Sequence, residues 1–356
     1  MQNYYVDSQK LFTKAIESVY KKQVVAIDTE FTRQKTYYPI LSLVQIAVGD
    51  EIFAVDCLAD IELKPIYDII SDQKIKKIFH SCSQDLEIFH QKDKNIAQNV
   101  CDIQLMANFC GIGYNIGYSG IVEELIGVKL DKKMQNSDWQ SRPLSKRQIE
   151  YAMLDVTYLE EIYQKLWTIL LEKKREKWFL QDMESVVNEP SVENRDNLLR
   201  NFIRDKKGYA KSGKNLAKLR HLILWREKMA QEIDVPRRHF LSDEALEKMA
   251  IGNNFNVNLS EKNICEIKNI FAQIESGNND VDLEEKIYIM SEAQKNQYVT
   301  AKNMVAKIAD DEGLKEQFLV TSGVLKDVVA KKKRVDELVF GWRYDLIGGK
   351  LEELIS

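Results

Sequence analysis

Apolar residues in the first half of the chain fall into short runs rich in β-branched side chains, a pattern that favours strands. These runs cover residues 24–31, 41–49, 51–56 and 76–79. Gly49-Asp50 separates the second run from the third and is typical of a hairpin turn. A helix is predicted over 83–90, shortly after the fourth run.

A long helical pattern begins near Ser145. Its apolar residues recur with a helical period, at positions 149, 152, 153, 156, 159, 163 and 166. Strands mixed with helices predict an α/β domain around a mixed sheet in this half of the chain.

The pattern changes after about residue 188, where Asn188-Glu189-Pro190-Ser191 interrupts any regular element. The remainder of the chain is helical and highly charged in pattern, with helices predicted over 215–232, 242–250, 260–276 and further segments to residue 355. Gly277-Asn278-Asn279-Asp280 is expected to divide this half into two small helical modules. A chain of 356 residues exceeds what one hydrophobic core usually serves, which fits several domains.

The composition is that of an ordinary globular protein, with 44% hydrophobic and 30% charged residues. No apolar run approaches the roughly 20 residues that a membrane helix needs, and the N-terminus lacks the pattern of a signal peptide. The five cysteines form no C-x-x-C pair, so free thiols in a reducing compartment explain them better than disulfides or zinc. We therefore expect a cytoplasmic protein with no membrane contact.

The net charge of −4 argues weakly against a nucleic-acid partner, but the distribution of charge is uneven. Between Arg200 and Arg238 there are twelve Lys or Arg and four acids, which gives +8 locally and leaves −12 for the rest. A solvated helix face is the simpler explanation of such a run. An acidic part beside a basic part is also what a metal-dependent nuclease would need.

Asp28 and Glu30 lie two positions apart at the end of the first strand run. Side chains alternate faces along a strand, so both carboxylates project to the same side. Such a pair repels and loses hydration, and Mg²⁺ or Mn²⁺ would relieve this because these ions prefer carboxylate oxygen. A D-x-E pair is common without metal, so the motif by itself does not establish a site.

Three further residues have both a functional and a structural interpretation. Asp85 falls in the first turn of the helix predicted over 83–90, where acids often cap the helix or complement its dipole. Tyr151 and Asp155 are spaced i, i+4 on one face of the long helix, at the edge of its apolar stripe. A carboxylate and a phenol placed there either bind a metal ion and hold a water, or simply reach solvent.

The combination is more informative than any one motif. The order strand pair, helix start and long helix resembles the DEDDy branch of the DEDD exonuclease superfamily, with the motifs AIDTEF, HSCSQDLEIF and QIEYAMLDVTYL. The stretches GYSGIVEELIGVKLDKK, SDWQSRPLSKRQ, TYYP and LVQI resemble the ribonuclease D subgroup specifically. The resemblance covers residues 24–165 and implies a ribonuclease H-like mixed-sheet domain.

The second half also resembles ribonuclease D. Residues 214–246 look like an HRDC domain, a small helical nucleic-acid-binding module found in ribonuclease D and RecQ helicases. The tail around Phe340-Gly341-Trp342-Arg343 is similar to the second HRDC-like module of bacterial ribonuclease D, although 285–320 carries no motif that can be placed. These matches imply an exonuclease domain over 1–188, an HRDC domain over 209–282 and a second HRDC-like domain over 285–356.

The resemblance implies a 3′–5′ exoribonuclease that releases 5′-nucleoside monophosphates with two divalent cations, Mg²⁺ or Mn²⁺, roughly 3.5–4 Å apart. Asp28 is expected to touch both ions, Glu30 and Asp155 to complete one site, and Asp85 to support the other. One ion would activate the attacking water and the other would stabilise the departing 3′-oxygen. The Tyr151 hydroxyl is expected to position that water, because a phenol pKa of about 10 is too high for a general base at neutral pH.

Substrate contacts are expected from Phe31, Arg33, His80 and Arg142, with a packed His80 and a surface Arg33 as the structural alternatives. The implied partner is RNA, especially tRNA precursors with 3′ extensions, and a monomer is expected. The helical modules would supply lysines and arginines for the RNA backbone. Removing residues 200–356 is therefore expected to weaken binding and flatten its salt dependence while metal-dependent hydrolysis persists.

Two other functions fit parts of the pattern. A DNA-directed exonuclease of the same superfamily would carry the same carboxylates, because sugar discrimination depends on contacts to the 2′-hydroxyl. The tandem HRDC-like tail favours RNA. A non-catalytic RNA-binding protein would not need all five motif residues, and Asp28→Asn distinguishes it, since we expect this change to abolish activity and retain folding.

Overall fold

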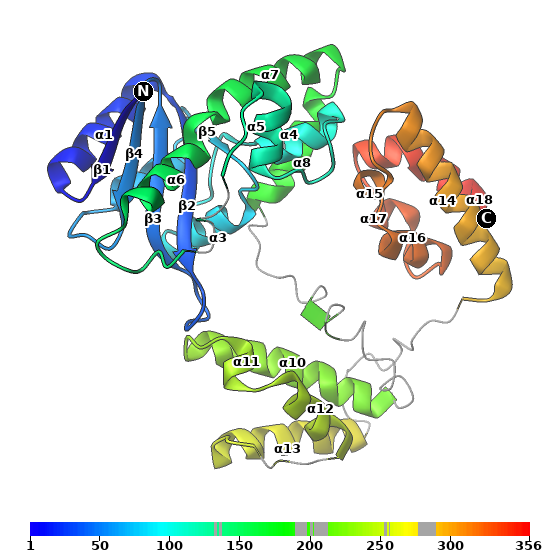
Figure 1. Cartoon of the computed structure of the whole chain (residues 1–356). Helices are drawn as coiled ribbons and strands as arrows, with labels where there is room; N and C mark the ends of the chain where they lie inside the picture. Colours follow the sequence, from blue (N-terminus) through cyan, green and yellow to red (C-terminus); the bar gives the residue numbers. More distant parts are fainter. Residues whose placement is uncertain are drawn as a thin grey trace. The chain divides into compact units, whose positions relative to one another are not determined.

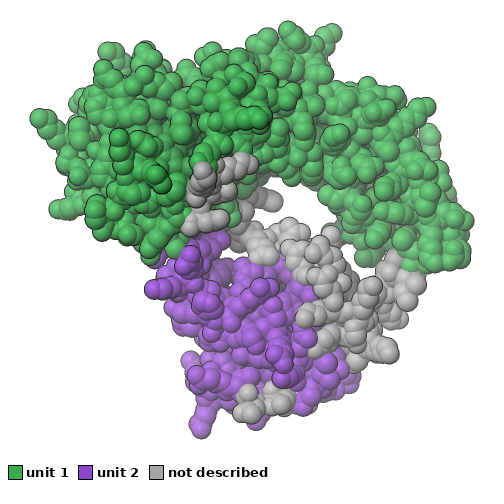
Figure 2. All heavy atoms as spheres, viewed as in Figure 1, with its two compact units in different colours: residues 1–32, 41–191, 290–356 green, residues 33–40, 192–289 purple. Residues whose placement is uncertain are grey.

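The computed structural model describes residues 1–131, 134, 137–188, 198, 199, 202, 213–252, 255, 257–276 and 290–356. The chain divides into two compact units (Figure 2). The first contains residues 1–32, 41–191 and 290–356, and the second contains residues 33–40 and 192–289. Each unit has a hydrophobic core of its own.

A six-stranded mixed sheet forms the centre of the first unit (Figure 1). Its strands are β1 (Gln2–Val6), β2 (Val24–Thr32), β3 (Ile40–Val48), β4 (Glu51–Asp56), β5 (Lys76–Phe79) and β6 (Val100–Asp102), in the order β1-β4-β3-β2-β5-β6. The predicted hairpin is confirmed, because β3 pairs antiparallel with β4. The pairs β1–β4, β2–β5 and β5–β6 are parallel, so the α/β class with a mixed sheet is confirmed.

In the described part of residues 1–188, eight helices accompany this sheet. They are α1 (Gln9–Lys22), α2 (Lys64–Ser71), α3 (Ser83–Lys92), α4 (Ile103–Cys110), α5 (Tyr118–Ile126), α6 (Lys146–Thr157), α7 (Leu159–Glu172) and α8 (Glu176–Asn188). Ser145 caps α6 in a reciprocal pair with Gln148, which explains why the helix starts there. The long helix predicted from Ser145 is wrong in one respect, since it is divided at Tyr158 into α6 and α7.

The C-terminal helices pack against the same core as the sheet. They are α14 (Glu292–Asp311), α15 (Glu316–Leu319), α16 (Ser322–Val329), α17 (Val335–Leu338), a π-helical turn (Tyr344–Gly348) and α18 (Gly349–Ile355). Trp342 stacks on Trp178 of α8 with ring centroids 4.9 Å apart, and Arg343 pairs with Asp182 at 2.8 Å. Removing these helices would uncover the Trp178 ring, so this packing argues against the expectation that hydrolysis persists without residues 200–356.

The second unit is helical in its described part. Its helices are α10 (Gly213–Glu232), α11 (Arg237–Phe240), α12 (Asp243–Gly252) and α13 (Glu261–Ser276), which confirms the three predicted over this range. Its core gathers side chains of α10, α12 and α13, such as Leu219, Leu246 and Phe271. The predicted divider at 277–280 lies outside the described residues. Within the described residues, no helix is long and apolar enough to span a bilayer.

Candidate active site

Three of the predicted carboxylates meet where α6 crosses the sheet. Asp28 and Glu30 lie on β2, and Asp155 lies near the C-terminal end of α6, which packs over β2 and β4 (Figure 1). Carboxylate oxygens of Asp28, Glu30 and Asp155 all lie within 4.8 Å of one another. Strand alternation places the first two on one face, and the i, i+4 face of α6 brings the third to them.

Asp85 lies beside this cluster, in the first turn of α3. It is only 6% exposed, and its Oδ1 accepts a hydrogen bond of 2.5 Å from the hydroxyl of Thr29, which stands between the two acids of β2. Its charge contributes to raising the pKa of both Asp28 and Glu30. Asp85 therefore belongs electrostatically to the site, although it does not share the tight three-oxygen contact.

The four acids favour their protonated forms in the absence of a cation. Burial, followed by repulsion from neighbouring acids, raises the pKa of Asp28 well above its usual range and that of Glu30 to about 9. Burial also raises the pKa of Asp85 and of Asp155 to about 7. A divalent cation would offset both causes, and its preferred ligands are the carboxylate oxygens gathered here. The donor set thus fits such an ion.

Tyr151 lies one turn before Asp155 on α6, and its hydroxyl interacts with that carboxylate closely enough to influence the pKa of both groups. Burial is the main cause that raises the pKa of Tyr151 far above its ordinary value, and the negative charges of Asp155 and Glu30 add to it. The phenol therefore stays protonated at neutral pH. It is suited to orient a water or a phosphate oxygen and unsuited to remove a proton.

Three of the expected substrate contacts fall into different surroundings. His80 follows β5, is partly exposed, and its Nε2 lies 3.0 Å from the Ile116 carbonyl, so one ring nitrogen has a backbone partner. Phe31 follows Glu30 on β2 and is partly buried against the core. Arg33 is an exposed residue of the segment that clusters with the second unit.

Arg142 does not fit its expected contact with phosphate. Its Nε and Nη2 donate to the two carboxylate oxygens of Asp56 at 2.7 and 2.6 Å, and Nη2 also donates to the Ser42 carbonyl. Nη1 donates to the carbonyls of Trp139 and Ser141. All five guanidinium hydrogens therefore have protein acceptors. Arg142 joins the 139–142 loop to β3 and β4, and we do not propose it as a residue of the site.

Asp102 is a site-supporting residue that the sequence interpretation missed. Its Oδ1 accepts from the backbone N–H of Ser81 at 2.9 Å and of Gln104 at 2.8 Å, and its Oδ2 accepts from Cys82 N–H at 2.9 Å. One carboxylate thus caps α4 and holds the turn that leads into α3. The available signal was an Asp directly after a short apolar run and before a helix.

Most of the described positive charge of residues 200–238 is already paired. Lys218 is 3% exposed and contacts Glu275 at 2.7 Å, and Arg226 is 2% exposed and contacts Asp243 at 2.7 Å. Lys214, Lys228, Arg237 and Arg238 also form ion pairs. Lysines and arginines at 200, 204, 206, 207 and 211 lie outside the described residues. The described part of this region offers less free charge than its sequence suggests.

The sequence interpretation assigned no role to a second basic segment, Lys331-Lys332-Lys333-Arg334, although it contains four consecutive basic residues. It joins α16 to α17 and lines an open hollow of about 620 Å³ with the C-terminal residues. Lys332 pairs with Asp327 and Arg334 with Asp336. Lys331 and Lys333 are exposed and pair with no acid in the described part of the chain.

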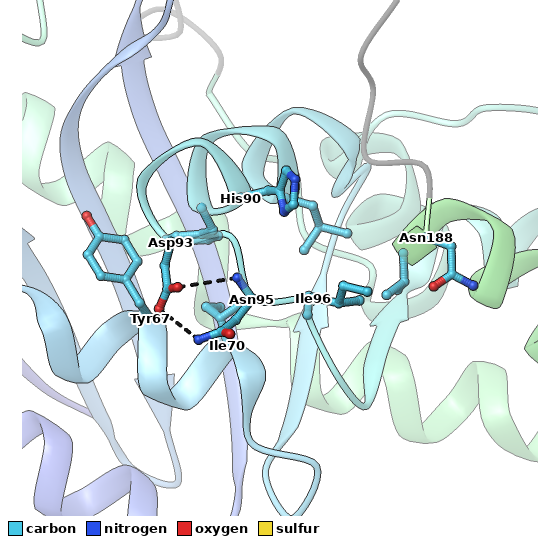
Figure 3. Close-up of a pocket in the computed structure, with 11 residues that line it drawn as sticks. Tyr67, Ile70, His90, Asp93, Asn95, Ile96 and Asn188 are labelled. Carbon is cyan, nitrogen blue, oxygen red and sulfur yellow. Dashed lines mark hydrogen bonds between the residues drawn. The ribbon is translucent and has the colours of Figure 1, made fainter. Parts of the chain in front are cut away.

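A separate pocket of about 120 Å³ lies between α2, α3 and the end of α8 (Figure 3). Its lining is mostly apolar, with Tyr67, Ile70 and Ile96 among its residues. The polar groups Asp93 and Asn95 bond to each other there, through Asn95 N at 3.3 Å and Nδ2 at 3.2 Å. None of the acids of the β2 and α6 cluster lines this pocket, so it is not part of the candidate site.

Comparisons with known proteins identify relatives of this chain among 3′-5′ exonucleases. A family model described as a 3′-5′ exonuclease matches residues 3–171. A ribonuclease D of Bartonella henselae is 31% identical over 358 residues, which covers 96% of this chain and 87% of that protein. A ribonuclease D of Zymomonas mobilis is 30% identical over 355 residues, with 93% and 88% covered.

The crystal structure of Escherichia coli RNase D, described as an exoribonuclease involved in structured RNA processing, has the same fold. It matches with a TM-score of 0.79 and 26% identity, covering 100% of this chain and 99% of that one. The match includes the helical C-terminal half as well as the mixed sheet. The chain belongs to the ribonuclease D family of 3′–5′ exoribonucleases, as its motifs indicated.

Proposed function

We propose that the chain shortens RNA from its 3′ end at the acid cluster formed by Asp28, Glu30, Asp85 and Asp155, with 5′-nucleoside monophosphates as products. The observation that carries this proposal is the approach of three carboxylates to within 4.8 Å, with Asp85 buried beside them. Carboxylates held this close repel one another when they are ionised, and a bound cation would offset this repulsion.

The cluster offers ligands for two divalent ions, Mg²⁺ or Mn²⁺. Asp28, Glu30 and Asp155 would hold one ion, while Asp28 and Asp85 would hold the second. When bound, such ions lower the pKa of the attacking water and offset the negative charge on the phosphate and the leaving 3′-oxygen. The structure supports the first ligand set by proximity and the second by the charge interaction between Asp28 and Asp85.

Tyr151 would hold the attacking water in line with phosphorus. Its hydroxyl interacts with Asp155 and stays protonated, so it offers a dipole at the edge of the cluster. Phe31 follows Glu30 on β2, and His80 lies between β5 and α3, the helix of Asp85, which makes both candidates for contact with the terminal nucleotide. Arg33 is a candidate for a phosphate on grounds of charge and exposure alone.

We further propose that the substrates are structured RNAs with 3′ extensions, with tRNA precursors as the first class to test. The proposed organisation is an exonuclease domain over 1–188, an HRDC domain over 209–282 and a second HRDC-like domain over 285–356, in a monomer. Lys331 and Lys333 are exposed and pair with no acid in the described part of the chain, which makes them candidates to meet a phosphate backbone. Five free cysteines fit a cytoplasmic enzyme.

A 5′-labelled single-stranded RNA tests the reaction. With Mg²⁺ or Mn²⁺ we expect a ladder that shortens from the 3′ end, and with a chelator we expect none. Asp28→Asn should fold and give no ladder. Internal cuts, or activity near that of the wild type in Asp28→Asn, would refute the assignment. A DNA strand of the same sequence, run in parallel, tests whether the enzyme prefers RNA.

A further inference from the structure

The helical segment that carries Asp155 is interrupted three residues after it, at Tyr158. α6 ends at Thr157 and α7 starts at Leu159, with Tyr158 between them at φ −107° and ψ 0° (Figure 1). In an uninterrupted helix, the N–H of Tyr158 would donate to the carbonyl of Leu154. That bond is replaced here.

The hydroxyl of Tyr118, the first residue of α5, occupies the place of that bond. It donates to the Leu154 carbonyl at 3.0 Å and accepts from the Tyr158 N–H at 3.1 Å. The Tyr158 N–H is also directed at the Val156 carbonyl. Insertion of a side-chain group between the N–H and C=O of a helical bond is an established cause of a helix break. The break therefore has a specific cause outside the helix.

Residues near α3 and α4 contact Tyr118 and the segment just before it. The carbonyl of Ile116, two residues earlier, lies 3.0 Å from Nε2 of His80 and accepts from Nε2 of Gln104 at 3.1 Å. The His80 ring meets the Tyr118 ring at 60°, with centroids 5.9 Å apart. His80 lies just before α3, the helix of the second acidic motif. Tyr118 thus connects the approach to α3 with the backbone on both sides of Asp155.

We propose that Tyr118 is a positioning residue for Asp155. Its hydroxyl fixes the break between α6 and α7, and this break sets where the Asp155 carboxylate stands relative to Asp28 and Glu30. Divalent ions such as Mg²⁺ require near-ideal ligand positions, so a small shift of one carboxylate weakens the whole set. The inference rests on the proposed function, because the cluster that Tyr118 positions is the one proposed to hold metal.

Tyr118→Phe tests the inference, since it removes only the hydroxyl. We expect kcat on a single-stranded RNA to fall by about tenfold or more, the range seen when a group that orients a metal ligand is lost. KM for RNA should stay within about twofold, because Tyr118 is not proposed to touch substrate. The rise in melting temperature caused by Mn²⁺ alone should shrink, which reports metal binding without turnover.

Tyr163→Phe is the matched control. Tyr163 is a buried tyrosine of α7, and its hydroxyl accepts from Nζ of Lys76 on β5 at 2.5 Å. It should keep the wild-type kcat and Mn²⁺ response even if it melts earlier. Equal losses in both variants would overturn the inference, and so would a Tyr118→Phe enzyme with wild-type kcat and Mn²⁺ shift. A wild-type chain without metal-dependent hydrolysis would instead contradict the proposed function, and the Mn²⁺ shift would still test Tyr118.

Discussion

The Thr29 hydroxyl donates a hydrogen bond of 2.5 Å to Asp85, which ties β2 to the first turn of α3 inside the acid cluster. Both residues are 6% exposed, so water has little access to replace this donor. The bond lowers the pKa of Asp85 against the larger effect of burial. Thr29 therefore helps to keep Asp85 available as an anion.

Thr29→Val removes the hydroxyl while nearly preserving the size and branching of the side chain. We expect the free energy of unfolding to fall by about 1–3 kcal/mol, since a buried acceptor loses its partner. We also expect kcat to fall by about tenfold. Urea unfolding and RNA hydrolysis measure the two effects. Thr168→Val, on the exposed side of α7, is the control, and an unchanged stability of Thr29→Val would contradict the role given to the bond.

The metal-free protein should lose stability as pH rises. The pKa of Asp85 and of Asp155 is about 7 in the folded chain and that of Glu30 is about 9, whereas unfolded carboxyls titrate at about 4. Between these values the folded state binds more protons than the unfolded state. The free energy of unfolding therefore decreases by several kcal/mol from about pH 4 to about pH 9.

Melting curves of the chelated protein across this range measure that slope. Saturating Mg²⁺ should flatten it, because the cation replaces the bound protons. Asp28→Asn should also flatten it, by removing one of the repelling charges, and should no longer respond to Mg²⁺. Glu124→Gln changes an exposed acid of α5 and should leave both slopes unchanged. A metal-free enzyme whose stability rises over the same pH range would contradict this prediction.

Lys77 of β5 destabilises the fold at neutral pH. It is fully buried, and its Nζ donates to the Asp72 carbonyl at 2.6 Å. Burial lowers its pKa to about 8, below the value of about 10.4 in an unfolded chain. Below pH 8 the Lys77 amine is charged in both the folded and the unfolded state, so the full cost of burying this charge lowers the stability. Stability should then rise as pH increases from about 8 to about 10.4, where the folded amine is already neutral.

Lys77→Met should therefore raise the free energy of unfolding at pH 7, by about 1–3 kcal/mol. The gain should shrink as pH approaches about 10. Urea unfolding at several pH values measures both effects. Lys74→Met, an exposed neighbour, should change stability by less than about 0.5 kcal/mol. A Lys77→Met protein that is less stable than the wild type at pH 7 would show that the bond to Asp72 outweighs the burial of charge.

The stack of Trp342 on Trp178 should make the C-terminal helices part of one unfolding unit with the sheet. Trp342 is 2% exposed, and its Nε1 donates to Asp182 at 2.9 Å. Trp342→Ala should lower the free energy of unfolding by about 3–5 kcal/mol, as expected for a large cavity. Phe340→Ala, two residues away and 61% exposed, is the control. If the C-terminal helices unfolded without any effect on the melting of the sheet, the coupling between the two would be contradicted.

The strands at 24–31, 41–49 and 51–56 were predictable because each is long enough to show its pattern. β1 and β6 were missed, whereas β5, with four residues, was predicted; β1 begins with two polar residues, and β6 has only three residues. The break at Tyr158 was invisible because the apolar stripe continues across it, and its cause is a hydroxyl forty positions earlier. The contacts of Arg142 were not predictable for a similar reason, since its partner Asp56 lies 86 residues away in sequence. Local motifs therefore predicted the acids, and tertiary contacts decided what supports them.

Lys331 and Lys333 should contribute to RNA affinity through phosphate contacts. Each contact to a single strand adds about 0.7 to the slope of log affinity against log salt. Replacing both by Ala should weaken binding at low salt and reduce that slope by up to about 1.4, with kcat on a short RNA unchanged. Filter binding at several salt concentrations measures the slope. Lys64→Ala removes one positive charge from an exposed pair with Asp68 and should leave the slope as it is. Identical slopes for the wild type and the double variant would show that this segment does not meet the RNA backbone.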